Sequence, residues 1–210
     1  MHFLRQCKFN KSGHAILMIF KLKWKNQYND ICKKANGIIS FLMRNIPTCP
    51  LPVKAKCFNT LVQPILEYGS CVWDPHCECD IEKIEKVQKR AARFVTNNYT
   101  REEGNTRINM RKLDWKPLQE RRAQSKLNIF YKAKAGSLDI PMDHLTINTS
   151  KTRRGNRTYA IPSSNVDSHL YSFYPSVIRL WNQLPDDAKS STSLEIFKKK
   201  TDNIVLREHY

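Results

Sequence analysis

The segment LVQPILEYGSCVWDPH (residues 61–76) is apolar and aromatic, contains a proline in its middle, and is followed at once by the charged segment DIEKIEKVQKRAARFV. An interior proline removes a backbone hydrogen bond and clashes with the carbonyl four residues before it, at a cost of about 3 kcal/mol. We therefore predict a helix from near Val53, kinked at Pro64 and ended by the Asp74-Pro75 step. Its buried face is predicted to carry Phe58, Leu61, Val62, Ile65, Gly69, Val72 and Trp73.

Apolar residues recur at spacings of three and four along most of the remaining chain, which is typical of amphipathic helices. The pattern predicts a long helix over 24–43, a helix capped by Asp80, one that runs from Leu118 and is closed by Gly136, one over 173–184 and a last one with Thr192 and Glu195 in capping-box spacing. No segment shows convincing strand alternation. We predict an all-α fold, an irregular helical bundle of about five or six helices.

The charge balance indicates a polyanionic partner. Lys and Arg total 36 against 19 Asp and Glu, which gives a net charge of +17. Such an excess favours nucleic acid, with anionic lipid as the rival. A membrane anchor is not predicted, because the longest apolar run, AILMIF (residues 15–20), is far shorter than the roughly 18 residues a spanning helix needs. We expect a soluble intracellular protein, nuclear or cytoplasmic.

No catalytic, metal or cofactor site is predicted. The seven cysteines are odd in number and scattered, so reduced thiols are expected. Cys71, His76, Cys77 and Cys79 form the one tight cluster, but zinc sites usually need a second ligand pair farther along the chain. The adjacent Asp186 and Asp187 lie in a polar segment without further acidic ligands.

Six blocks of the sequence, in one order, resemble the region after the polymerase core in non-LTR retrotransposon reverse transcriptases of the jockey and CR1-like kind. They are KANGIISFLMRNI, VKAKCFNTLVQPILEYGSCVWDPH, IEKIEKVQKRAARFVTNNY, LDWKPLQERRAQSKLNIFYKAKAG, TRRGN and SFYPSVIRLWNQLP with SLEIFKKK. The similarity covers residues 24–200. The blocks most similar to the family's usual sequence are LEY with the following VW, and VQKRAARF.

The resemblance implies a thumb and post-thumb region. It divides the chain into a divergent lead-in (1–22), a helical thumb-like domain (23–136), a basic loop or linker (137–166) and a C-terminal helical segment (167–210). The family's polymerase metal site lies in palm motifs that include an aromatic-x-Asp-Asp turn, and these 210 residues contain no such turn. The endonuclease domain of relatives is also missing. We therefore expect no enzymatic activity from this chain. We interpret it as a truncated copy of such an element or as a sequence whose start codon was wrongly assigned.

Basic side chains are the predicted nucleic-acid contacts. The segment 80–134 holds 15 Lys or Arg and seven Asp or Glu, and a thumb packs helices against a product duplex. KTRRGNR (151–157) adds four cations without an anion; it is compatible with nuclear import and equally with an ordinary basic loop. The predicted site comprises Lys83, Lys86, Lys89, Arg90, Arg93, Arg121, Arg122, Lys151, Arg153, Arg154 and Arg157.

The predicted function is a non-catalytic protein that binds RNA, DNA or an RNA–DNA hybrid through the phosphate backbone. The alternative is a protein-interaction or scaffold module whose basic faces meet acidic protein or a polymerase core in trans. Trp73, Trp115 and Trp181 are expected in the core rather than stacked on bases, because each lies on an apolar stripe or beside a helix start.

Overall fold

The computed structural model describes residues 24–100, 104–140, 142, 145–146, 159–163, 165–202 and 204. Within these residues the chain is helical and forms no strand, so the predicted all-α class is confirmed. Several short helices accompany the predicted long ones. The elements are α1 (Lys25–Asn45), α2 (Leu51–Cys57), the π-helix η2 (Phe58–Val62), α3 (Gln63–Glu67), α4 (Ser70–Trp73), α5 (Glu78–Thr96), α6 (Asn105–Lys112), α7 (Leu118–Lys134), α8 (Asp167–Leu170), α9 (Phe173–Gln183), α10 (Asp186–Lys189) and α11 (Leu194–Asp202).

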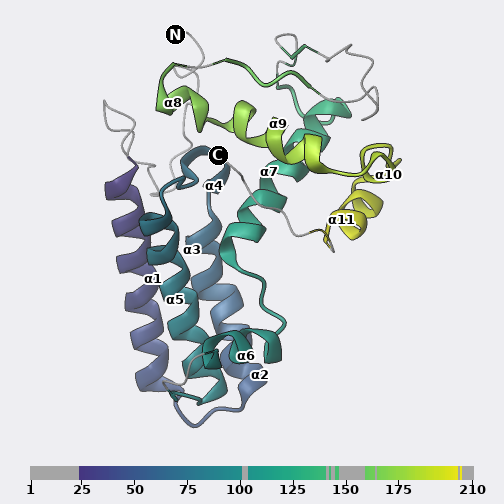
Figure 1. Ribbon diagram of the computed structural model, residues 1–210. Coiled ribbons are helices and arrows are strands. Elements are labelled where there is room, and N and C mark those ends of the chain that lie inside the picture. Colours follow the sequence, from purple (N-terminus) through teal and green to yellow (C-terminus); the bar gives the residue numbers. More distant parts are fainter. Residues whose placement is uncertain are drawn as a thin grey trace.

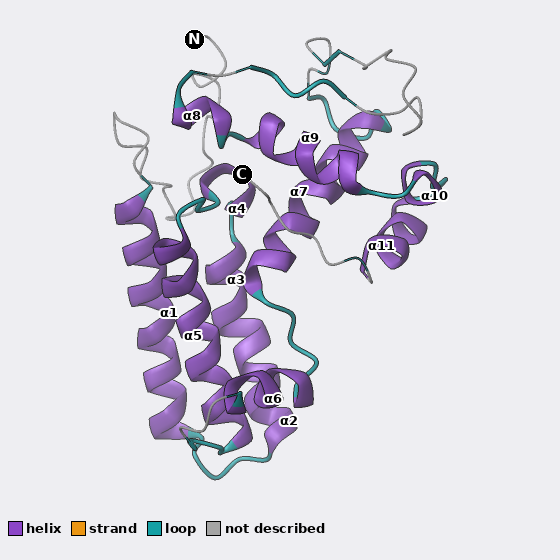
Figure 2. Cartoon of the chain, viewed as in Figure 1, coloured by secondary structure: helices purple, strands orange, loops and turns teal. Residues whose placement is uncertain are grey.

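The helices form two groups that share α7. Figure 1 shows α1, α5 and the α2–α3 segment side by side in an elongated lower bundle, with α6 across its lower part. Helices α9, α10 and α11 gather at the other end around the C-terminal part of α7. Coloured by secondary structure, the described chain is helix and connecting loop throughout (Figure 2).

The chain accommodates Pro64 by a π-helical turn placed directly before it. Gln63 donates its backbone N–H to Phe58, five residues back, so the helix carries one extra residue where Pro64 would otherwise leave a carbonyl without a donor. This insertion changes which side chains face inward. Phe58, Val62 and Leu66 are buried, but Leu61 is 47% exposed, which corrects its assignment to the buried face.

The end of the opening stretch also differs from a simple kinked helix. Gly69 has φ +65°, a conformation that glycine adopts without steric cost, and it starts the separate short helix α4. Trp73 is fully buried there, and its indole N–H donates to the Tyr68 carbonyl at 2.8 Å. Val72 is 48% exposed, because the break at Gly69 turns it away from the core.

The first core lies within the lower bundle. Its buried side chains come from α1, η2, α3, α4 and α5, and Leu118 adds the start of α7. The ring of Trp115 stacks on Phe58 with centroids 4.2 Å apart, so this tryptophan is a packing residue as expected. Lys54 is also buried. It donates to the Asn97 side chain at 2.9 Å and lies over the Phe94 ring, and so ties α2 to the end of α5.

The second core is built from α7, α9 and α11. Phe130, Trp181 and Phe197 are fully buried, and the Trp181 ring contacts the rings of the other two, which confirms the core assignment of Trp181. The described part of the predicted linker also packs here. Tyr159 meets Phe130 edge-on and exchanges two hydrogen bonds between its backbone and the Asn182 side chain.

Two helix starts differ from their predicted caps. Helix α5 begins at Glu78, so Asp80 lies in its first turn, where it pairs with Lys83 at 2.8 Å instead of capping the helix. In the last helix the side chain of Ser193, rather than Thr192, accepts the backbone N–H of Ile196. Both shifts are of the one or two residues by which helix boundaries commonly vary.

A buried ionic network joins the two groups of helices. The Asp74 carboxylate, just after α4, accepts from Arg122 at 2.6 Å and pairs with Lys126 at 2.7 Å. Lys126 also donates to the hydroxyl of Ser176 on α9 at 2.6 Å. The side chains of Arg122 and Lys126 are 0% and 2% exposed, so neither cation has access to bulk water as a substitute partner.

We predict that Asp74→Ala destabilises the fold by about 3–5 kcal/mol, because it leaves two buried cations without their counter-charge. Chemical denaturation at neutral pH measures this loss. Glu82→Ala is the matched control: it removes a carboxylate that pairs with Lys89 at the surface and should cost less than about 1 kcal/mol. Equal losses in the two variants would contradict the central role of Asp74.

Candidate nucleic-acid interface

The predicted basic face of α5 is partly neutralised by the helix itself. Lys83 pairs with Asp80 at 2.8 Å, and Lys89 pairs with Glu82 at 3.1 Å. These are surface pairs that a phosphate can displace, but they lower the net charge that the N-terminal half of α5 presents. Lys86 is exposed, whereas the other four cations of the predicted α5 set are partly buried.

Arg90 is occupied by contacts with α1, which corrects its assignment to an open basic surface. Its guanidinium donates to the side chains of Asn36 at 2.7 Å and Ser40 at 2.9 Å. Helix α5 lies between α1, α6 and α7, so only a narrow strip of it reaches solvent. Arg93, near its end, is half-buried.

The two predicted contacts on α7, Arg121 and Arg122, are also engaged in contacts within the fold. Arg121 forms a two-pronged ion pair with Glu67 of α3. Arg122 is 1% exposed and belongs to the Asp74 network, so it is unavailable to a phosphate, and this correction removes it from the site. Lys151, Arg153, Arg154 and Arg157 lie outside the described residues.

These placements predict unequal effects for two α5 substitutions. Arg90→Gln loses hydrogen bonds from a charged donor to α1 and should destabilise the fold by about 1.5–3 kcal/mol. Lys86→Gln changes an exposed side chain and should stay within about 0.5 kcal/mol of the original stability. Thermal or denaturant unfolding of the two single variants distinguishes them; an Arg90 variant as stable as the Lys86 variant would show that the α1 contacts contribute nothing.

An outward-facing basic surface lies on α6, which the sequence patterns did not reveal. Arg107, Arg111 and Lys112 are all exposed, Ile108 between them is 50% exposed, and the helix contains no acidic residue. Arg107 and Arg111 are four residues apart and lie on one side of the helix, and Ile108 and Lys112 lie about 100° farther round it. We call them the α6 basic face. The signal that could have found it is NTRINMRK, in which three cations occur without an anion.

A cluster of asparagines fixes the orientation of α6. The Asn98 side chain donates to the side-chain oxygens of Asn105 at 2.7 Å and Asn109 at 3.2 Å. Asn109 returns a hydrogen bond to the Asn98 carbonyl at 3.2 Å. Asn97, with φ +51°, ends α5 directly before this cluster. Because Asn105 and Asn109 are buried against α5, the opposite side of α6 must face solvent.

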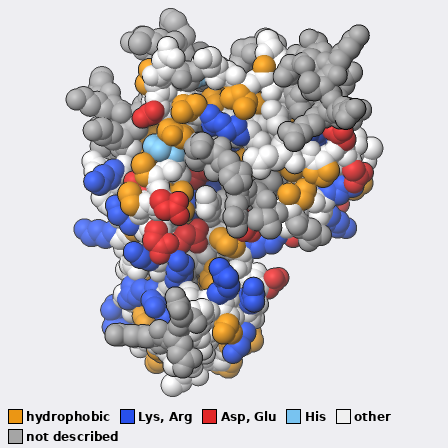
Figure 3. All heavy atoms as spheres, in the orientation of Figure 1, with side chains coloured by type: hydrophobic (Ala, Val, Ile, Leu, Met, Phe, Trp, Pro, Cys, Tyr) orange, Lys and Arg blue, Asp and Glu red, His pale blue; other side chains and the backbone are white. Residues whose placement is uncertain are grey.

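Further exposed cations occur on α1 and α2. Figure 3 shows Lys and Arg side chains over the lower half of the molecule, where Figure 1 places α2 and α6, with hydrophobic side chains between them. Lys56 on α2 and Arg44 in the last turn of α1 are exposed, as is the ring of Tyr99, at 53%. Cations mixed with exposed apolar and aromatic groups suit a partner that has both phosphates and base or sugar surfaces.

Helix α7 is held at its start by a carboxylate of α5. Glu85 accepts the backbone N–H of Gln119 at 2.8 Å, which satisfies one of the amides that a helix N-terminus leaves without an intrahelical partner. Burial raises the pKa of Glu85, although this amide, the neighbouring amide of Leu118 and the charge of Arg122 act in the opposite direction.

The raised pKa of Glu85 has a predictable effect on stability. The contribution of such a group is complete below the unfolded-state pKa of about 4.3 and is lost as pH rises through the folded-state pKa. Glu85→Gln keeps a carbonyl acceptor for Gln119 and cannot ionise. The stability of this variant relative to the original chain should therefore increase as the pH rises from about 4 to about 8. Unfolding curves across this range, with Glu82→Gln as a surface control, give the measurement; a difference that shrinks with pH would refute it.

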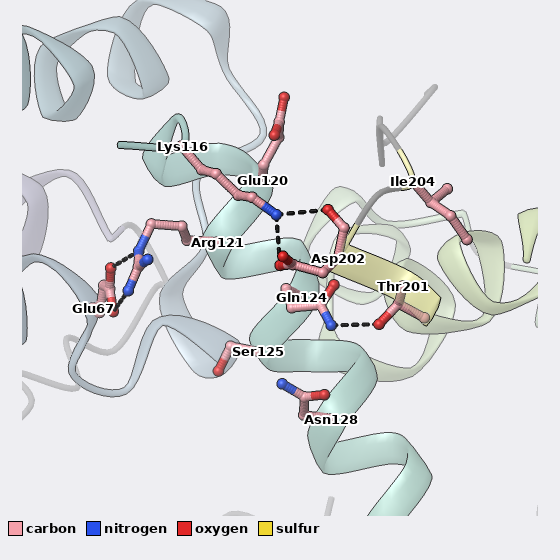
Figure 4. A pocket seen from close by; sticks show the side chains of 10 residues that line it. All are labelled: Glu67, Lys116, Glu120, Arg121, Gln124, Ser125, Asn128, Thr201, Asp202 and Ile204. Atoms are coloured by element: carbon pink, nitrogen blue, oxygen red, sulfur yellow. Dashed lines mark hydrogen bonds and ion pairs between the residues drawn. The ribbon is translucent and has the colours of Figure 1, made fainter. Parts of the chain in front are cut away.

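A polar cleft lies where α3, α7 and α11 meet (Figure 4). Its volume is about 240 Å³, but both of its cations, Lys116 and Arg121, are already paired with carboxylates. Lys116 contacts Asp202 at 2.5 Å, Arg121 pairs with Glu67, and Gln124 donates to Thr201 at 2.6 Å. The cleft is thus a closed set of contacts between the two helical groups.

The cysteine cluster does not assemble a metal site in the described part of the chain, where no group of three or more His, Cys, Asp or Glu side chains has that arrangement. Cys77 and Cys79 are exposed, whereas burial raises the pKa of Cys71. The His76 ring stacks on Tyr171 with centroids 3.9 Å apart. Asp187 pairs with Lys200 instead of forming an acidic site with Asp186.

Comparison with models of protein families, with curated proteins and with solved structures returns no significant match. Among the described helices, none combines the length and apolarity needed to cross a bilayer.

Proposed function

We propose that this chain binds the sugar-phosphate backbone of RNA, DNA or their hybrid through the α6 basic face, and that it acts as the thumb-like region of a non-LTR reverse transcriptase without catalysing polymerisation itself. The observation that carries the proposal is three exposed cations on a helix without acidic residues, in a chain of net charge +17. A helix of this kind lies along phosphates without reading base sequence.

The cations of α6 have no competing carboxylate within their own helix. On α5, Lys83 and Lys89 have carboxylates within 3.1 Å, so a phosphate must displace an existing partner. Helix α6 carries no carboxylate that can neutralise Arg107, Arg111 or Lys112 from within the helix. A phosphate that approaches these cations does not have to displace a carboxylate of their own helix, so each of them can release counterions from a bound phosphate backbone.

The sequence resemblance supports the same partner. In non-LTR reverse transcriptases the blocks that this chain resembles follow the polymerase core, where a thumb packs against the product duplex. The palm motifs of that family are not among these 210 residues, so primer extension with magnesium and nucleotides should give no product above background.

The test is the combined substitution Arg107→Gln, Arg111→Gln and Lys112→Gln. Glutamine is a comparable helix former, so the fold should persist. Affinity for a nucleic-acid duplex should fall for every sequence alike. The slope of log affinity against log salt should become shallower by up to about 0.9 for each phosphate that the variant no longer neutralises. Fluorescence anisotropy at several salt concentrations provides both quantities.

The matched control is Lys132→Gln, Lys198→Gln and Lys199→Gln, which removes three exposed cations from the other helical group. Both triple variants lower the net charge equally, so a loss confined to the α6 variant locates the interface. Equal losses would mean that only overall charge matters. Unchanged affinity and slope in the α6 variant would overturn the proposal, and a partner that binds with little salt dependence would favour the scaffold alternative.

A further inference from the structure

A second cleft lies immediately beyond the α6 basic face. It is formed between η2 and α3 on one side and the connection from α6 to α7 on the other, and its volume is about 370 Å³. This is within the range of small-molecule sites, roughly 300–1,000 Å³. Leu113 and Asp114, the two residues that follow Lys112, are part of its lining. The cleft therefore begins where the basic face ends.

The polar groups of this cleft are mainly carboxamides. Asn59 and Gln63 come from the η2–α3 segment, and Gln88 comes from α5. A carboxamide presents a donor and an acceptor side by side, which matches the hydrogen-bonding edge of a nucleobase. Leu113 and Trp115 add apolar surface on the opposite wall, suited to the face of a planar ring.

Gln88 supplies an independent indication of a ligand. This residue is 2% exposed, and its side-chain N–H donates to the backbone carbonyl of Lys116 at 3.1 Å. Its side-chain oxygen is buried and has no hydrogen-bond partner. A buried acceptor without a donor costs about 1–3 kcal/mol. A ligand in the cleft with an N–H or amino group would satisfy this oxygen once the Gln88 side chain turned toward it.

The charges in the cleft favour an uncharged group over a phosphate. Lys116 and Arg121 line it, but Lys116 is bound to Asp202 and Arg121 to Glu67. Asp114 adds a negative charge to the same wall. With its cations already paired, this cleft has little to attract a phosphate, whereas the neighbouring α6 basic face has three exposed cations for that purpose.

We propose that this cleft receives one unpaired nucleobase, with its donor edge toward Gln88, from a strand whose phosphates lie on the α6 basic face. The binding of the strand to the α6 basic face rests on the proposed function. The fit of a nucleobase to the cleft rests only on the residues that line it. It adds a preference for single-stranded or frayed ends, which phosphate contacts alone do not produce.

The experiment compares two single-stranded oligonucleotides of equal length and charge, one normal and one abasic, with the full chain. The normal strand should bind about tenfold more tightly, a gain typical of base contacts with protein side chains. The variant Asn59→Leu/Gln63→Leu should lose this preference and keep its salt slope. The control Asn26→Leu/Gln27→Leu places the same changes on α1, away from the cleft, and should keep both. A preference that survives in the Asn59/Gln63 variant overturns the proposal.

A titration with free nucleosides tests the cleft separately from backbone binding. Side-chain amide signals of Asn59, Gln63 and Gln88 in ¹⁵N-edited NMR spectra should shift saturably on addition of cytidine or adenosine, and ribose alone should leave them unchanged. If oligonucleotides fail to bind, the proposed function is disproved. The nucleoside-induced shifts still show whether the cleft binds a nucleobase. If the amide signals do not move, the cleft is an ordinary surface hollow and the proposal fails.

Discussion

The arrangement of the two helical groups depends on the carboxylate of Asp74. It lies at the end of the opening apolar stretch and meets Arg122 and Lys126, one helical turn apart on α7. Lys126 then reaches Ser176 on α9, so a single acidic side chain fixes α4, α7 and α9 relative to one another. Because both cations are almost fully buried, any other arrangement of these helices leaves charge without compensation.

Glu85 extends the same constraint to α5. Its carboxylate holds the first amides of α7, and Arg122 is close enough to favour its charged form, which lowers the pKa against the effect of burial. Two carboxylates on the α4–α5 side thus oppose two cations on α7. Helix α7 is fixed by these charges at one end and by the aromatic contacts of Phe130 at the other, which is why it belongs to both cores.

This use of basic residues changes how the charge of the chain must be interpreted. Arg90, Arg121 and Arg122 stabilise contacts between helices, so they add to the net charge without adding to an open binding surface. Helix α6, by contrast, carries exposed cations and no acidic residue. The asparagine cluster determines this outcome, because it buries one side of α6 against α5 and leaves the other side to solvent.

The sequence by itself determined the helical class and most of the core. Apolar spacing identified α1, α5, α7 and α9, and it placed Trp73 and Trp181 inside, because a periodic apolar stripe on a helix can be recognised from the local sequence. The sequence also located the charge excess. It did not identify α6 as a helix, since NTRINMRK has too few apolar residues to show a period, and its helix is held by asparagine contacts instead.

Only the tertiary structure decided which cations face water. Arg121 and Arg122 are adjacent in sequence, yet one pairs at a half-exposed site and the other is buried against Asp74, 48 residues away. Their partners come from other helices, so no local pattern distinguishes them. The π turn before Pro64 is similar: the sequence shows that the proline must be accommodated, but only the structure shows the inserted residue and the outward position of Leu61.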